Sequence, residues 1–169
     1  MTSPSRNSGP QGGASHGIRV FSTPSELKAA VGDELGPGEW LHITQDRIDA
    51  FADATGDRQW IHVDVARATR ESPFGSPIAH GFLSLSLVSM LNWQIYTIEN
   101  TSLAVNYGLN KVRFINPVRV DAHVRLRTTV NSVDDAPEGA LQLVTTSTLE
   151  IAGEDKPALV AETVGRIMF

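Results

Sequence analysis

A carboxyl group and an imidazole stand five residues apart at Asp57 and His62, directly after a glycine that should end a helix. An imidazole with an ordinary pKa of about 6.5 exchanges protons near neutral pH, and a carboxyl group beside it can orient a proton or deliver one. The negative end of the preceding helix should favour a protonated imidazole nearby. If the loop between them folds back, Asp57 and His62 can hold one water molecule, which suggests hydration or dehydration chemistry.

Two alternatives to this chemistry fit the same residues. The spacing of Asp57 and His62 is not specific, and a surface loop without chemistry accounts for it when it is taken alone. Asp57, His62, Asp64 and His80 could instead ligate a divalent ion, since carboxylate and imidazole suit several. The chain has no pair of histidines spaced along one helix, so we expect no metal.

The second candidate segment runs from Ser76 to Phe82, where an apolar helix is expected to begin. Backbone N–H groups at a helix start lack partners, and Gly81 lets a ligand approach closely because it has no side chain. Such donors can stabilise the oxyanion that a thioester carbonyl becomes. A core His80 and a tightly packed Gly81 without a binding role would fit the same residues.

Lys111 and Arg113 should project from one face of a strand, where they could pair with phosphates. A solvated strand face is the ordinary interpretation of alternating charges. No G-x-S-x-G sequence surrounds the serines after Gly81, so we expect no covalent serine.

Two helices should position these groups. Thr44 is a plausible N-cap for a helix with one apolar stripe, and Gly56 should end it. Ser76 and Pro77 should start a second helix that runs to about Trp93. Its apolar run is too short to cross a bilayer, and a helix that is apolar all round must be surrounded by protein.

The second half of the chain predicts a sheet. Apolar and polar residues alternate over 112–114, 123–130 and 141–151, as in half-buried strands. The segments 131–139 and 152–157 are rich in turn residues and too short for crossover helices. We therefore expect an α+β fold, in which an antiparallel meander wraps its apolar face around the long helix.

Composition limits the remaining possibilities. The chain has 169 residues, no Cys and a net charge of -5, so it forms one domain without disulfides or thiol chemistry and without the basic surface that nucleic acid needs. Residues 1–20 should be a disordered arm, and 21–169 the folded domain. The arm carries no apolar signal segment, so we expect a cytoplasmic protein that binds no membrane.

With these features the chain resembles the MaoC-like dehydratases, or (R)-specific enoyl-CoA hydratases, of the hot-dog superfamily. Three ordered motifs carry the resemblance: Phe51-Ala52 with Asp57-x4-His62-x-Asp64, then Phe74-Gly75-x-Pro77-Ile78-Ala79-His80-Gly81, then Val112-Arg113-Phe114-x-x-Pro117-Val118. They cover roughly residues 40 to 120. The sequence departs from the family at Arg58, Gln59 and Trp60, where many members have an Asn-Pro-like loop.

The resemblance implies a single hot-dog fold and a homodimer whose two sheets join edge to edge, with acyl-CoA in a tunnel at the interface. It implies that Asp57 and His62 hold the water that adds syn to trans-2-enoyl-CoA, giving (R)-3-hydroxyacyl-CoA in fatty acid metabolism, with no cofactor. The Gly81 amide would be the oxyanion donor, His80 would shape that turn, and Ser89 would lie near the dyad.

Three functions stay open. The first is the hydratase, acting on a CoA or an acyl-carrier-protein thioester. The second is a hot-dog acyl-CoA thioesterase, in which water attacks the carbonyl carbon. The third is a non-catalytic subunit that binds an acyl ligand.

Overall fold

The computed structural model describes residues 17–169, so most of the expected N-terminal arm lies outside the described residues. The first strand already begins at Arg19, two residues inside the segment predicted as arm. The elements are β1 (Arg19–Phe21), α1 (Pro24–Ala29), β2 (Glu34–Leu35), β3 (Leu41–His42), α2 (Gln45–Thr55), α3 (Trp60–Val63), α4 (Val65–Glu71), α5 (Gly81–Asn92), β4 (Tyr96–Ile98), β5 (Leu103–Phe114), β6 (His123–Asp135), the 3-10 turn Pro137–Gly139, β7 (Leu141–Ile151) and β8 (Leu159–Met168).

The main sheet is antiparallel, with the strand order β2-β6-β7-β8-β5 and with β3 also paired to β6. The predicted meander is confirmed for β6, β7 and β8. It is wrong for β5, which pairs with β8 at the far edge of the sheet instead of with β6. The chain between β5 and β6 does not turn back at once, because residues 118–120 first pair with the segment that leads into α5.

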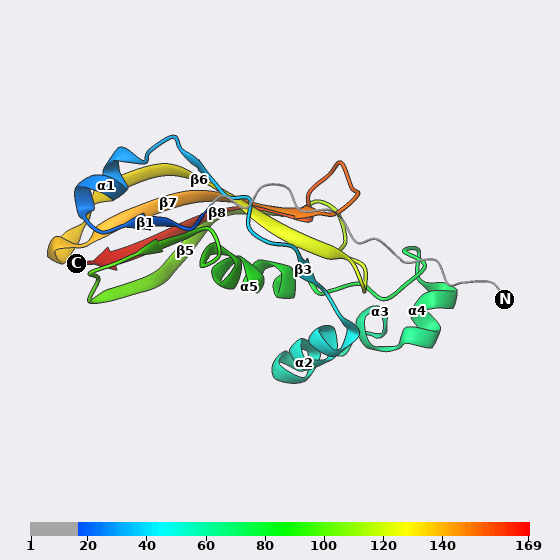
Figure 1. Cartoon of the computed structure of the whole chain (residues 1–169). Helices are drawn as coiled ribbons and strands as arrows, with labels where there is room; N and C mark the ends of the chain where they lie inside the picture. The colour runs from blue at the N-terminus through cyan, green and yellow to red at the C-terminus, as the bar shows by residue number, and fades with distance from the viewer. Residues whose placement is uncertain (1–16) are drawn as a thin grey trace.

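The helix α5 packs against the inner face of this sheet, which curves over it (Figure 1). Leu83, Leu87 and Leu91 on the helix are buried with Leu126 and Leu149 on the sheet. Burying several such side chains, at roughly 1.5–3 kcal/mol each, holds the helix in place. The α+β fold is therefore confirmed.

The start and the surroundings of α5 differ from the prediction. Ser76 and Pro77 do not begin the helix, because the segment before Gly81 is extended: Ile78 bridges to Arg119. The helix is not enclosed on every side in one chain, since Phe82 is 69% exposed and Trp93 just after the helix is 77% exposed. No helix within residues 17–169 is long and apolar enough to cross a membrane.

The helices α2, α3 and α4 extend from the start of α5, beyond the sheet (Figure 1). The predicted limits of α2 are confirmed: the Thr44 hydroxyl accepts from the Arg47 amide, and Gly56 takes the left-handed conformation at φ 78°. The helix α4 is capped in a similar way, because the Asp64 carboxylate accepts from the Arg67 amide. The four-residue helix α3 was not predicted, since one turn is too short to show a periodic pattern.

Candidate active site

Asp57 lies in the turn that follows α2. The left-handed Gly56 redirects the chain, and the Asp57 carboxylate then accepts a long hydrogen bond of 3.4 Å from the Gln59 amide. The side chain is exposed. The turn thus presents a carboxylate to solvent at a fixed place beside α3.

His62 lies on α3 and is only 6% exposed. Its Nδ1 is 2.6 Å from the carbonyl oxygen of Ile78. A carbonyl oxygen can only accept, so Nδ1 carries the proton, and in the neutral ring Nε2 has a free lone pair. The backbone therefore selects the tautomer in which Nε2 can accept a proton.

The charge state of His62 differs from the expectation. Burial lowers the pKa of His62 below 6.5, and the bond to the Ile78 carbonyl and the charge of Asp57, which both raise the pKa, do not offset it. The prediction that the helix end would favour a protonated imidazole is wrong for this residue. Near neutral pH, His62 is a neutral ring that is ready to act as a base.

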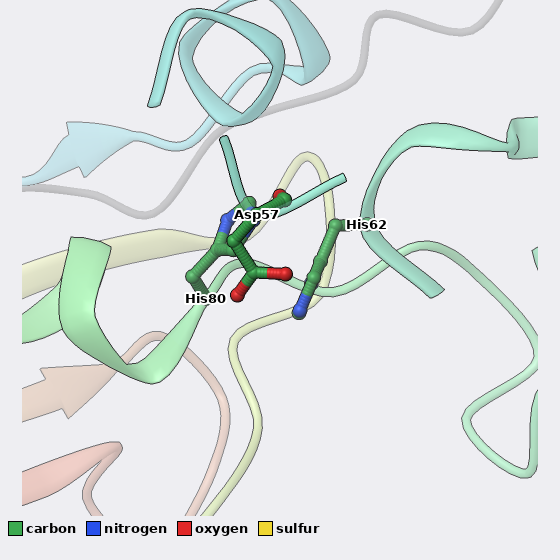
Figure 2. A group of neighbouring side chains, drawn as sticks. All are labelled: Asp57, His62 and His80. Carbon is green, nitrogen blue, oxygen red and sulfur yellow. The ribbon is translucent and has the colours of Figure 1, made fainter. Parts of the chain in front are cut away.

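The structure brings the predicted pair together. One carboxylate oxygen of Asp57 and one ring nitrogen each of His62 and His80 lie within 4.8 Å of one another. A water molecule that makes two hydrogen bonds of about 2.8 Å spans a similar distance between its partners. Figure 2 shows the Asp57 carboxylate directed into the space beside the His62 ring.

The predicted alternative of a metal site is only partly reproduced. Asp57, His62 and His80 cluster, whereas Asp64 caps α4. Each imidazole already uses one nitrogen on a carbonyl: His62 on Ile78, and His80 on Asp57. The remaining nitrogen of His80 is buried, so only Asp57 and His62 have ligand atoms that a metal ion could reach.

Gly81 is the first residue of α5, and its N–H donates to no acceptor within residues 17–169. It lines a cavity of about 240 Å³. Ile78, whose carbonyl holds His62, lines the same cavity, so the segment before α5 connects the dyad to the wall of this space. A Cβ atom at position 81 would lie 3.2 Å from the ring of Phe114, which explains why a glycine stands here.

Within a single chain, the other predicted site residues lie away from the dyad. Ser89 accepts a hydrogen bond from Asn106 and lines a separate cavity of about 310 Å³. Eight residues of helix, about 12 Å, separate Ser89 from Gly81. Val112 packs against the core and Phe114 faces Gly81, so Lys111 and Arg113, which alternate with them, lie on the outer face of the sheet, opposite α5.

Two contributors to the site were not predicted. The Ile78 carbonyl sets the His62 tautomer, and the Gln45 amide donates to the His62 carbonyl at 2.7 Å. Backbone groups leave no trace in residue types, and a glutamine in the first turn of a helix is ordinary. Nothing in the sequence pointed to either of them.

The curved sheet around α5 is the hot-dog fold, which solved hydratases share. A family model described as a MaoC like domain matches residues 26–152, so the chain belongs to the MaoC-like dehydratase family, as the three motifs predicted. The chain is 47% identical over 149 residues to 3-hydroxyacyl-thioester dehydratase Z of Mycobacterium tuberculosis, with 88% of this chain and 98% of the relative covered.

Two further similarities agree with this assignment. Nodulation protein N of Rhizobium leguminosarum bv. viciae is 45% identical over 157 residues, with 91% of this chain and 94% of that protein covered. The structure of R-hydratase PhaJ1 from Pseudomonas aeruginosa superposes with a TM-score of 0.62 at 25% identity, with 86% of this chain and 83% of that chain covered.

Proposed function

We propose that this protein is an (R)-specific enoyl-CoA hydratase, which adds water reversibly across the C2–C3 double bond of a trans-2-enoyl thioester to give the (R)-3-hydroxyacyl thioester. The coarser class, a hydro-lyase, follows from membership of the dehydratase family. The observation that carries the proposal is the Asp57 carboxylate beside His62, within reach of one shared water.

The geometry supports a specific division of labour. The water oxygen bonds to C3 while its proton passes to Nε2 of His62, the nitrogen that the Ile78 carbonyl leaves unprotonated. Asp57 accepts a hydrogen bond from the second O–H of the water, which stays intact, and so orients the lone pair of the water oxygen toward C3. The electron pair of the double bond moves toward the thioester oxygen, where the unpaired Gly81 N–H donates to the developing negative charge. C2 then takes its proton from the dyad, so that one water is added in total.

The test is the loss of enoyl absorbance from crotonyl-CoA with purified protein. We expect Asp57→Asn and His62→Gln to lower kcat by at least about 100-fold, because general acid–base groups contribute 10²–10⁴. Matched controls are Asp53→Asn, on the exposed side of α2 in an ion pair with Arg58, and His42→Gln, on β3 with its Nε2 3.0 Å from Asp121 Oδ1. A normal rate in both dyad variants would remove the mechanism.

Assays with the same purified protein distinguish a hydratase from a thioesterase. A thioesterase releases free CoA thiol from acyl-CoA, whereas a hydratase leaves the thioester intact. Two proton-handling groups around one water suit addition to a double bond, so we expect no thiol release. Binding of enoyl-CoA without turnover would instead indicate the non-catalytic subunit. A parallel series with acyl-carrier-protein thioesters then decides between the two carriers.

We also propose that the protein is a homodimer joined along β5. This strand has twelve residues, pairs only with β8 among the described strands and is exposed along nearly its whole length. Val105, Tyr107 and Leu109 are among its exposed apolar side chains. An open edge of this length and character is a template for pairing, and a second copy in antiparallel register satisfies it.

A further inference from the structure

His80 was expected to shape the turn that presents the Gly81 amide, and its surroundings show a contact with the Asp57 turn as well. The residue precedes α5 and is 2% exposed. Its Nε2 donates to the backbone carbonyl of Asp57 at 2.8 Å. The ring therefore contacts the polypeptide that carries the dyad and is shielded from solvent.

We propose that His80 is a positioning residue of the dyad, which ties the Asp57 turn to the start of α5 and lies flat against His62. This inference rests on the proposed function. Its geometric basis is that one buried ring joins the three elements that bear the dyad and the oxyanion donor.

The bond from His80 is the tie that links Asp57 to α5. The other hydrogen bonds of Asp57 among the described residues stay within the turn: its amide reaches Thr55 at 3.4 Å, and its carboxylate accepts from Gln59 at 3.4 Å. Both are long. Without His80, the turn depends on these weak local contacts, and the exposed carboxylate loses its fixed place.

Stacking fixes the other half of the pair. The His62 and His80 ring centroids are 3.8 Å apart with an interplanar angle of 25°, and Phe51 of α2 lies 5.1 Å away on the ring of His80. The His62 ring is thus held by the Ile78 carbonyl at one edge and by His80 on its face. Its Nε2 then has little freedom to turn away from Asp57.

The unsatisfied atom of His80 argues against simple packing. A carbonyl partner requires Nε2 to carry the proton, so Nδ1 is an acceptor, and within residues 17–169 it is buried without a partner. Leaving a buried acceptor unpaired costs stability, and an apolar side chain of similar size would avoid that cost. A histidine at this position is explained by the bond that its other nitrogen makes.

The test uses a matched pair, His80→Gln and His80→Met. Both side chains are unbranched and similar in length, but only Gln can donate to the Asp57 carbonyl. We expect His80→Met to lower kcat for crotonyl-CoA by about 10- to 100-fold with KM within about 2-fold, since small misplacements of reacting groups have effects of that size. His80→Gln should recover most of the lost kcat. Phe51→Leu, which removes packing against His80 without touching the bond, should keep kcat within about 3-fold.

Hydrogen exchange of the backbone amides 57–59 supplies a readout that does not need turnover. We expect faster exchange in His80→Met and near-normal exchange in His80→Gln, at equal melting temperatures. If His80→Met does not fold, His80→Asn replaces it, because its amide is too short to reach the carbonyl. Equal kcat and equal exchange in the Gln and Met variants would overturn the inference. A wild-type protein without hydratase activity that still shows the exchange difference would defeat the proposed function alone.

Discussion

Replacing Gly81 with alanine tests whether the start of α5 must stay in its present position for catalysis. The added Cβ would lie 3.2 Å from three edge atoms of the Phe114 ring, to within 0.1 Å, where ordinary contact needs 3.4–4 Å. Relief requires a shift of a few tenths of an ångström in the helix start or the ring. Such overpacking costs about 1–3 kcal/mol, and the helix preference of Ala returns up to about 1. The net loss is therefore about 0–3 kcal/mol, and each kcal/mol corresponds to roughly 2–4 °C in Tm for a chain of this size.

The catalytic effect can be measured separately from the thermal one. The Gly81 N–H must sit within about 2.7–3.1 Å of the oxyanion, so its displacement should lower kcat for crotonyl-CoA about 10-fold at 25 °C, well below Tm. The double variant Gly81→Ala/Phe114→Leu removes the collision and should restore both Tm and most of kcat, whereas Phe114→Leu alone reports the cost of the lost ring. Unchanged kcat in Gly81→Ala, or no recovery in the double variant, would refute the assignment of this N–H to the substrate.

Three further expectations follow from the charges and the exposed edge. The acid limb of kcat/KM should fall tenfold per pH unit with a midpoint below 6.5, because burial lowers the pKa of His62 and only the neutral ring accepts a proton; a midpoint at or above 6.5 in a stopped-flow pH series contradicts this. Burial raises the pKa of Glu150, but the hydrogen bonds from Arg125 and Arg127 outweigh it and hold that pKa below 4.5. Glu150→Gln should therefore lower the free energy of unfolding in urea by about 1–3 kcal/mol at pH 7. This difference should shrink as the pH falls through the pKa of Glu150 in the folded protein. Val105→Lys on the β5 edge should convert a dimer into a monomer in light scattering and lower kcat/KM; a monomeric wild type would dismiss the β5 pairing.

Periodicity and caps predicted the helices well where the chain is locally consistent. Thr44 and Gly56 bound α2 because a hydroxyl cap and a left-handed glycine act within one turn of the residues that they fix. The same rules failed at Ser76 and Pro77. The backbone of this segment pairs with residues 118–120, some forty positions later. Local sequence signals carry no information about so distant a partner.

The residues of the candidate site could be proposed from the sequence, but its proton positions could not. Asp57, His62 and Gly81 follow from residue types, spacing and the family resemblance, and the dehydratase family is confirmed. The neutral state of His62 could not be predicted, because it depends on the burial of the ring, and its tautomer is set by a backbone carbonyl. The edge position of β5 was missed for a similar reason, since strand order is decided by contacts across the whole chain.

The direction of α5 relative to β5 gives Ser89 a place in the proposed dimer. Gly81 faces Phe114 at the end of β5, and Ser89 bonds to Asn106 near its beginning, so the helix and the strand run in opposite directions. If two β5 strands pair antiparallel about a two-fold axis, the two α5 helices also run antiparallel, and the second half of one helix lies alongside the first half of the other. The 310 Å³ cavity lined by Ser89 then faces the partner's dyad instead of its own. Under that pairing we expect each candidate site to take its acid–base groups from one copy and the Ser89 wall from the other.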